Sequence, residues 1–340
     1  MQKLKIFLIL PIIIFFGIWG CNQKSYSYGD FESVIVFSDS VLYEKMLPVL
    51  EKTFDQFIYT PHSEKSFYLH RRSIRDLNAL KRRRNLLFLG LLNGQDEESR
   101  YIQKMLSGEL KQALNRGELF YIFKEDLFAL NQMCIILTAQ DEKQLYQKID
   151  QYSQTIFNIL EKYNFKRLSV LHYADGHQDK LEQYLSERYG FTLKIPLDYQ
   201  LIKETPDSNF IWLKRLRPDR NLVVYRYRGT QLPTDEEWLF NLRDSLGLVH
   251  FMGDSINRED SYMQTTTFDS LDAVKLIGVW ENFNPEAGGP IGGPFRSYVF
   301  ADKPNGWIYL IDISVTDPGE WKKPFLDQLE VIAATFRLTK

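Results

Sequence analysis

The sequence contains little cysteine, since Cys21 and Cys134 are the two in 340 residues. A disulfide framework and a cysteine-based zinc site are therefore excluded, and stability must come from packing. Cys134 lies in an apolar run from Met133 to Leu137. That run predicts a buried strand in which the cysteine is a small core residue rather than a nucleophile.

The sequence also lacks an excess of charge of one sign, because 42 Lys and Arg face 44 Asp and Glu. A nearly neutral chain does not predict nucleic-acid binding. There is no Gly-x-Ser-x-Gly motif of a hydrolase serine and no histidine spacing typical of a metal site. The histidines are His62, His70, His172, His177 and His250. We therefore predict no catalytic residue, no metal and no cofactor.

The one long apolar run is at the N-terminus. Lys3 and Lys5 precede an apolar stretch from Ile6 to Trp19, and Gly20 stands before Cys21. A basic head, an apolar core shorter than the roughly 20 residues of a membrane-spanning helix and a small residue before the cut predict a signal peptide, residues 1–20. The alternative is an uncleaved membrane anchor helix.

A cysteine directly after such a segment resembles the lipobox of bacterial lipoproteins. The resemblance implies cleavage before Cys21, acylation of that cysteine (palmitate among the acyl chains) and attachment to a membrane. Residues 21–30 are polar and aperiodic after the cysteine, which predicts a tether. Asn22 rather than an aspartate follows Cys21, and no acidic run comes after it. By analogy with resembling lipoproteins, we expect the periplasmic face of the outer membrane.

Residues 31–189 alternate strand-like and helix-like segments, which predicts an α/β domain. Asn85 to Leu91 is apolar throughout and predicts a strand buried on both faces. Helical stripes extend over residues 98–115 and 141–163, the second predicted to be the longest helix. Pro48 should bend or divide the helix that begins after Ser40.

From Gly190 to Lys340, closely spaced strands and turns predict an α+β domain with a mostly antiparallel sheet covered by helices. Thr234, with Glu237 three residues later, predicts the capping box of one helix. Pro324 predicts the start of the last helix.

Two resemblances concern the body of the chain. The whole chain resembles an uncharacterised lipoprotein family of Bacteroidota, domain-of-unknown-function family 4837, which implies no activity. The residues that carry this match are Cys21, Arg84 to Leu87, Phe191 to Pro196, Trp212-Leu213, Trp280-Glu281 and Gly292 to Phe295. Residues 190–340 also resemble the fold shared by PsbP, Mog-type Ran-binding proteins and LpqN-type lipoproteins. The residues that carry this second match are Gly190 to Pro196, Tyr199 and Ile332 to Phe336. That fold commonly serves binding and assembly.

The glycine-rich loop 284–294 is the candidate ligand site. Glycines permit a close approach of a ligand to the backbone, and aromatic and charged residues flank the loop on both sides. The residues predicted to form a ligand groove are Trp280, Glu281, Gly292, Gly293, Arg296 and Tyr298. The simpler interpretation is a long hairpin loop that needs glycines for its turns.

The basic stretch Lys81 to Arg84 has two interpretations, a contact with anionic lipid headgroups or a solvated helix and turn. For the whole protein we predict a lipid-anchored cell-envelope module that binds a protein, a small molecule or a lipid. One alternative is an envelope hydrolase acting on glycan or lipid, which a pocket lined by two or more carboxylates would favour. Another is a structural component of an envelope complex, favoured by an exposed apolar patch without a pocket.

Overall fold

The computed structural model describes residues 24–58, 63–316 and 321–339. The predicted signal peptide, residues 1–20, and the predicted lipid attachment at Cys21 lie outside the described residues. In the parts of the chain that the structure describes, no helix is long and apolar enough to cross a membrane.

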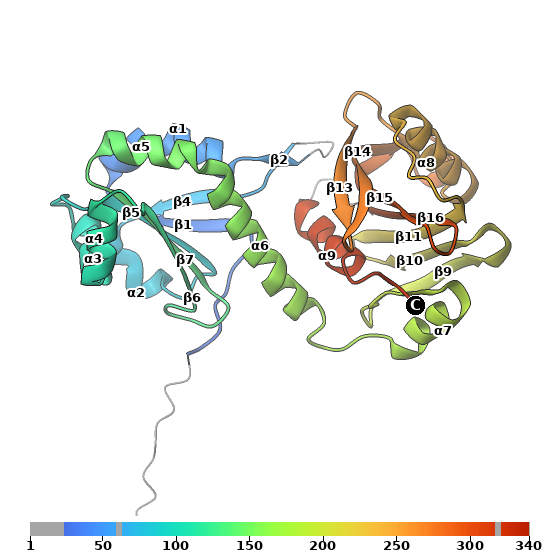
Figure 1. Ribbon diagram of the computed structural model, residues 1–340, viewed down its shortest axis with the longest axis horizontal. Helices are drawn as coiled ribbons and strands as arrows, with labels where there is room; N and C mark the ends of the chain where they lie inside the picture. Colours follow the sequence, from blue (N-terminus) through green and yellow to red (C-terminus); the bar gives the residue numbers. More distant parts are fainter. Residues whose placement is uncertain (1–23, 59–62, 317–320, 340) are drawn as a thin grey trace, which may run out of the picture.

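The N-terminal region is built on a five-stranded mixed sheet in the order β4-β1-β5-β7-β6 (Figure 1). Its first four members in that order pair in parallel, and β6 is antiparallel to β7. Alternate strand residues enter two separate apolar clusters, so both faces of the sheet are buried, as the sequence predicts. The strands are β1 (Ser33–Phe37), β4 (Tyr68–Arg72), β5 (Asn85–Leu91), β6 (Tyr121–Glu125) and β7 (Met133–Ala139).

Helices cover both faces of this sheet. One face packs against α1 (Ser40–Phe54), α5 (Glu142–Gln151) and α6 (Ser153–His172). The other packs against α3 (Glu97–Met105) and α4 (Gly108–Asn115), with α2 (Leu77–Leu80) beside them (Figure 1). The predicted α/β class is confirmed for this region.

The C-terminal region contains a mostly antiparallel sheet in the order β12-β14-β15-β16-β11-β10-β9, with β13 also paired to β14. One face packs against α7 (Asp179–Tyr189) and α9 (Lys323–Ala333), and the other against α8 (Glu236–His250). The predicted α+β class is confirmed here too. The strands are β9 (Gln200–Thr205), β10 (Phe210–Arg215), β11 (Asp219–Arg228), β12 (Ser255–Ile256), β13 (Tyr262–Phe268), β14 (Leu271–Asn282), β15 (Ile291–Asp302) and β16 (Trp307–Thr316), while β8 (Phe191–Thr192) pairs with β17 (Arg337–Leu338).

Several predicted boundaries differ from the structure. The helix α1 continues through Pro48 without division. The stripe over residues 98–115 is two helices, because Leu106 is extended and Ser107 caps α4. The stripe over residues 141–163 divides at Tyr152, whose ring packs on Phe120, so α6 is the longer helix.

A further difference concerns a helix cap. Asp235 rather than Thr234 caps α8, because its side chain accepts the N–H of Trp238 at 2.8 Å. The domain boundary at residue 189 stays a prediction, and Leu185 and Tyr189 of α7 pack in the C-terminal core. This packing groups α7 with the second sheet.

A cavity at the junction of the two sheets

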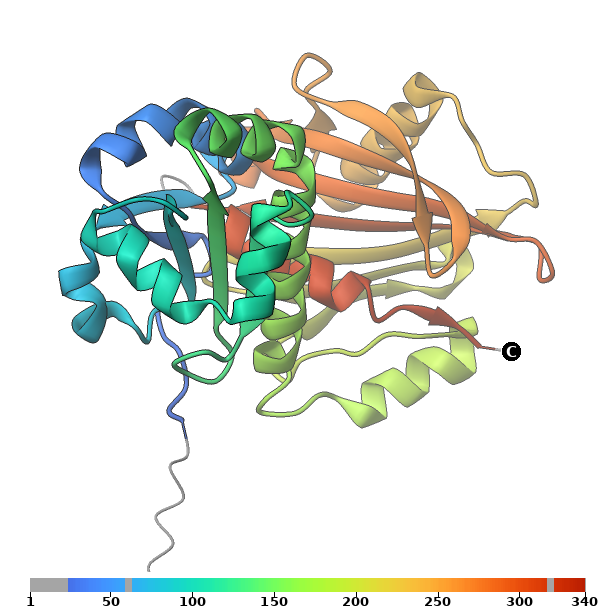
Figure 2. The ribbon, with the colours of Figure 1, turned by 60° about the vertical axis from the view of Figure 1, so that its left-hand side comes forward.

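Two parts of the N-terminal region reach the C-terminal region: α6 and the pair formed by β2 (Phe57–Ile58) and β3 (Glu64–Lys65). Figure 1 shows both extending between the regions, and Figures 1 and 2 both place α6 beside α9. Ile58 is buried in the core of the C-terminal region. The two sheets are therefore joined by packing as well as by the chain.

Glu64 forms the most specific polar contact across this junction. Its carboxylate accepts the backbone N–H of Lys322 at 2.9 Å and of Lys323 at 2.8 Å. The helix α9 has no side-chain cap of its own, so Glu64 supplies acceptors for N–H groups that a helix start leaves free. Trp321 stacks on Tyr68 nearby, with ring centroids 4.8 Å apart and planes at 6°.

A cavity of about 940 Å³ lies at this junction. Its walls come from α6, α9, the strands β13 to β15, the strand β2, residues 66–67 and residues 29–32. This volume is at the upper end of the roughly 300–1,000 Å³ of ligand pockets, which often form between domains. The aromatic residues lining it are Phe31, Phe57, Phe67, Phe157, Phe165, Tyr262 and Trp321.

A buried ionic cluster forms one side of the cavity. Glu330 of α9 accepts Arg296 Nη1 at 2.7 Å, Lys275 Nζ at 2.9 Å and the Tyr298 hydroxyl. Burial would raise the pKa of Glu330, but Lys275, Arg296 and Tyr298 outweigh burial and lower it to about 2. Glu330 is therefore a carboxylate at neutral pH, with its acceptor sites occupied by these neighbours.

The other carboxylates differ in their partners. Asp327 pairs with Lys323 one turn away on α9. Glu32 and Glu161 form no ion pair within the described parts of the chain, and burial raises the pKa of each. The Glu161 side chain is open to water in the cavity, yet the surrounding walls still remove bulk solvent from it. Glu32 and Glu161 are thus carboxylates without an ion-pair partner in the described residues, and Asp30, which also lines the cavity, forms no ion pair there either.

The predicted ligand groove at loop 284–294 has a different arrangement. The flanking strands do pair, but Trp280 is 2% exposed and packs in the cluster beneath α8. Arg296 lines the cavity on the opposite face, and Tyr298 reaches Glu330 there. The structure therefore brings Arg296 and Tyr298 together and separates them from Trp280.

The remaining residues predicted for that groove have local roles. Gly292 and Gly293 each lie where a Cβ would meet a backbone oxygen, at 2.7 Å from Trp280 O and 1.9 Å from Val315 O. Close packing of β15 between its neighbours thus requires these glycines. Glu281 is half-buried and accepts the side-chain N–H of Asn257 at 3.4 Å. Neither glycine nor Glu281 lines the cavity.

The carboxylates of the cavity were not predicted as site residues from the sequence. Glu32 and Glu161 have no motif around them, because elements far apart in sequence bring them together. Lys323, Asp327 and Glu330 do leave a signal, since their spacing places three charges on one face of α9. Such a stripe is commonly solvent-facing, and nothing in the sequence says that α6 covers it.

The basic stretch Lys81 to Arg84 contacts the first residues of the chain that the structure describes. Tyr28 lies beneath the guanidinium of Arg83, 4.7 Å from the ring centroid, and the main chain of residues 25–28 bonds to residues 82 and 130. Arg84 Nε donates to Gly29 O at 2.8 Å. Part of the predicted tether therefore packs on the body, because the Tyr28 ring finds cationic partners and the main chain finds hydrogen bonds. A contact with anionic lipid stays a prediction.

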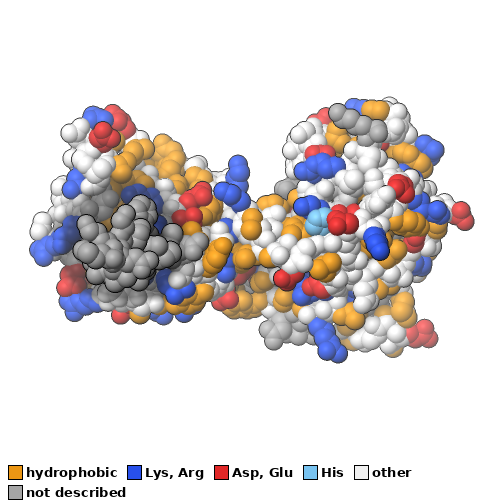
Figure 3. Space-filling model, turned by 90° about the horizontal axis from the view of Figure 1, so that it is seen from below, with side chains coloured by type: hydrophobic (Ala, Val, Ile, Leu, Met, Phe, Trp, Pro, Cys, Tyr) orange, Lys and Arg blue, Asp and Glu red, His pale blue; other side chains and the backbone are white. Residues whose placement is uncertain are grey.

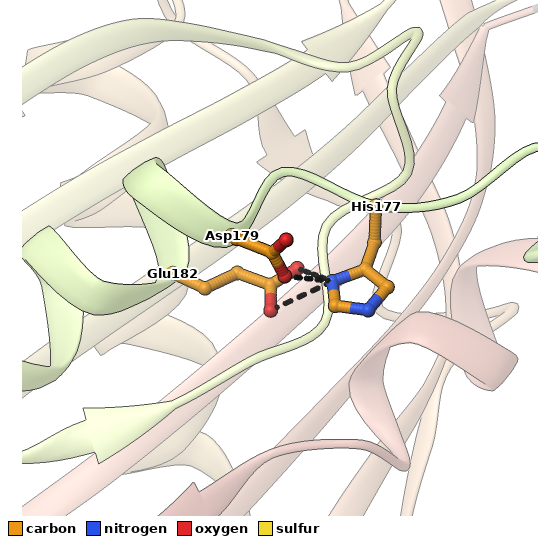
Figure 4. A group of neighbouring side chains, drawn as sticks. All are labelled: His177, Asp179 and Glu182. Carbon is orange, nitrogen blue, oxygen red and sulfur yellow. Dashed lines mark hydrogen bonds and ion pairs between the residues drawn. The ribbon is translucent and has the colours of Figure 1, made fainter.

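His177, Asp179 and Glu182 form the group in the described residues whose ligand atoms are close enough to share a cation (Figure 4). His177 Nδ1 lies 2.9 Å from Glu182 Oε1 and 3.2 Å from Asp179 Oδ1. The same Glu182 oxygen also accepts Ile195 N at 2.8 Å. These contacts fasten the start of α7 to the segment after β8, which explains the group without a metal.

Cys134 is a free, fully buried cysteine, as the sequence predicts. Burial raises the pKa of its thiol to about 12, so the thiol stays protonated at neutral pH.

Charged side chains of both signs are scattered over the face seen in Figure 3, where the two regions form lobes joined by a narrower waist.

Two family models match separate parts of the chain. Domain of unknown function (DUF4837) matches residues 178–335, and Domain of unknown function (DUF8532) matches residues 27–171. The resemblance to family 4837 is thus confirmed for the C-terminal region, whereas its expected coverage of nearly the whole chain is wrong. No curated protein matches the chain.

The solved structures that match include the neighbours expected for the C-terminal region. PsbP of Synechocystis (CyanoP) is 10% identical with a TM-score of 0.30, over 44% of this chain and 86% of that one. The Ran-binding protein Mog1p of Saccharomyces cerevisiae is 12% identical with a TM-score of 0.30, over 44% and 91%. LpqN of Mycobacterium tuberculosis, described as involved in cell envelope biogenesis, is 14% identical with a TM-score of 0.29, over 44% and 83%.

A crystal structure from Bacteroides thetaiotaomicron also matches, at 9% identity and a TM-score of 0.29. The match covers 45% of this chain and 46% of that one, so this chain spans less than half of its length. At these identities and scores, none of the four structures says what this protein binds.

Proposed function

We propose that this protein is a lipid-anchored binding protein of the cell envelope that holds a ligand in the cavity at the junction of its two sheets. The observation that carries the binding role is the cavity of about 940 Å³, with aromatic rings and uncompensated carboxylates in its walls. Both regions contribute to those walls, so the site needs the whole body of the protein.

The anchoring part of the proposal rests on the sequence before the described residues. Lys3, Lys5, the apolar stretch and Cys21 support export and acylation, with the periplasmic face of the outer membrane as the proposed address. Metabolic labelling with an alkyne-tagged palmitate should label the protein and fail to label Cys21→Ser. Equal labelling of Cys21→Ser, or none of either chain, would contradict acylation at this cysteine.

The cavity is tested by filling it. Asn158 lies on α6 and lines the cavity, whereas Thr155, one turn earlier and also exposed, does not. Nile red, a neutral apolar dye, should gain fluorescence with the intact protein. We expect Asn158→Trp to remove most of this gain and the matched control Thr155→Trp to keep it. If both variants bind the dye equally, the cavity is not the binding site.

A second candidate function is hydrolysis, because five carboxylates line the cavity: Asp30, Glu32, Glu161, Asp327 and Glu330. The ion pairs with Lys323, Lys275 and Arg296 occupy two of them, which leaves Asp30, Glu32 and Glu161. Of these three, Glu32 and Glu161 have a raised pKa, so they are the candidates for acid and base chemistry. A raised pKa suits a general acid. Turnover of envelope glycan or lipid esters that Glu32→Gln and Glu161→Gln each abolish would establish this role, and no turnover by the intact protein would remove it.

A further inference from the structure

The chemistry of the cavity, taken as the binding site proposed above, identifies a class of ligand. Besides the Lys323–Asp327 pair and the exposed Asp30 and Lys162, the charges that line it form two groups. Lys275 and Arg296 share Glu330, at 2.9 and 2.7 Å. Because Glu330 is ionised, an anionic ligand would have to compete with a carboxylate already held by these two cations. The cations of this cluster are therefore poorly placed to attract an anion.

The second group is Glu32 and Glu161, and its charge is not balanced. Within the described residues, no other side chain donates a hydrogen bond to either carboxylate, and neither forms an ion pair. After burial, the largest electrostatic influences on the pKa of both are Lys323, which favours the charged form, and Asp327, which opposes it and already binds Lys323. Arg296 and Lys275 favour the charged form of Glu161 as well, but both are already paired with Glu330. Glu32 is buried, and a buried carboxylate without a partner costs free energy that a cationic ligand would recover. Glu161 opens into the cavity, where such a ligand can reach it.

The apolar part of the cavity is also incomplete without a ligand. Phe57 is 62% exposed and Trp321 is 54% exposed, although both line the cavity. Rings of this kind attract cations through their π-faces and bury the apolar body of a ligand. Aromatic walls next to unpaired carboxylates are the combination that recognises ammonium groups.

We propose that the cavity binds an organic cation, an ammonium group on an apolar body, with Glu32 and Glu161 as counter-charges and Phe57 and Trp321 as apolar walls. The inference rests on the proposed binding function and adds the charge and chemical class of the ligand.

Titration calorimetry of the intact protein with three probes that share a hexyl chain tests the proposal: hexyltrimethylammonium, hexanol and hexyl sulfate. We expect the cation to bind at least tenfold more tightly than the alcohol or the sulfate. Glu32→Gln and Glu161→Gln should each weaken cation binding at least fivefold and leave hexanol binding unchanged. Glu118→Gln, at an exposed ion pair outside the cavity, is the matched control and should change nothing.

The variants are chosen to fold. Removing an uncompensated carboxylate takes away an unfavourable charge, so Glu32→Gln and Glu161→Gln should melt at or above the temperature of the unaltered chain. Phe57→Ala changes an exposed ring and should weaken all three probes.

The remaining outcomes overturn the proposal in distinguishable ways. Equal binding of the three probes, with Phe57→Ala weakening each, removes the cationic class and keeps the cavity as a binding site. Tightest binding of hexyl sulfate also removes it and assigns the site to Lys275 and Arg296. If none of the three probes binds but Nile red does, the cationic ligand class is refuted and the proposed binding function stands. If Nile red fails as well, the proposed binding function falls with it.

Discussion

Arg243→Met is expected to lower the free energy of unfolding by about 3–5 kcal/mol, because it leaves a buried aspartate without its cation. Arg243 Nε donates to Asp312 Oδ1 at 2.9 Å, and the two side chains are 6% and 9% exposed. Asp312 also accepts the Ser297 hydroxyl at 2.5 Å. The pair links α8 to β16 within the core, so no water is at hand to solvate the remaining carboxylate.

Urea denaturation measures this effect as a lower midpoint at an unchanged slope. Arg75→Met is the matched control, since Arg75 pairs with Glu97 but is 77% exposed, and it should change stability by less than about 0.5 kcal/mol. Replacing Asp312 by Leu and Ser297 by Ala together with Arg243→Met should restore much of the loss, because no polar group is then left unpaired. An Arg243→Met midpoint equal to that of Arg75→Met would contradict the assignment of a buried pair.

The architecture of each region was predictable because burial leaves a period in the sequence. Leu86 to Leu91 is an unbroken apolar run since helices cover both faces of β5. Local capping interactions compete with this apolar periodicity, which explains why some predicted helix ends differ from the observed ones. Ser107 accepts the N–H of Leu110 and starts a new helix inside one apolar stripe. Pro48 fails to break α1, so the packing of the helix as a whole outweighs its local cost.

The cavity was not predictable, because it depends on how two sheets are joined. Glu64 is an ordinary acidic residue in the sequence, and its role follows from meeting the N–H groups of Lys322 and Lys323. Arg296 was selected from its place beside a glycine-rich loop, but its partner Glu330 is 34 residues away on α9. Trp280 was selected for the same reason and points to the other face of the sheet. Neighbours in sequence alternate between faces of a strand, and only the register shows which share a site.

The ionic cluster of the cavity and the core pair Arg243–Asp312 both place buried charges beside charges of the opposite sign. They differ in their surroundings, because only the cavity also contains carboxylates without an ion-pair partner. In the core, each charge has its partner and the ligand-free protein is complete. In the cavity, Glu330 satisfies Lys275 and Arg296, while Glu32 and Glu161 remain without cations. The protein thus keeps carboxylates without an ion-pair partner beside the cavity, where a ligand can reach them, and pairs its charges in the core.

Glu330→Gln is expected to destabilise the protein by about 3–5 kcal/mol at pH 7, because Lys275 and Arg296 then face each other without a carboxylate. Their side chains are 15% and 16% exposed, so water screens this repulsion only in part. The matched control Glu118→Gln removes the same charge from a pair in which both side chains are more than half exposed, and should change stability by less than about 0.5 kcal/mol.

The effect of Glu330→Gln should also depend on pH in a defined direction. The folded pKa of Glu330 is lowered to about 2, below the value near 4.3 of an unperturbed glutamate. Its charge therefore contributes full stability above about pH 4.3, and the contribution is lost as pH falls toward 2. Urea midpoints of the unaltered chain and of Glu330→Gln should lie far apart at pH 7 and converge below about pH 4. A difference that stays constant from pH 7 to pH 3 would show that the substitution acts through packing, and that Glu330 is not the charge that holds Lys275 and Arg296 in the wall of the cavity.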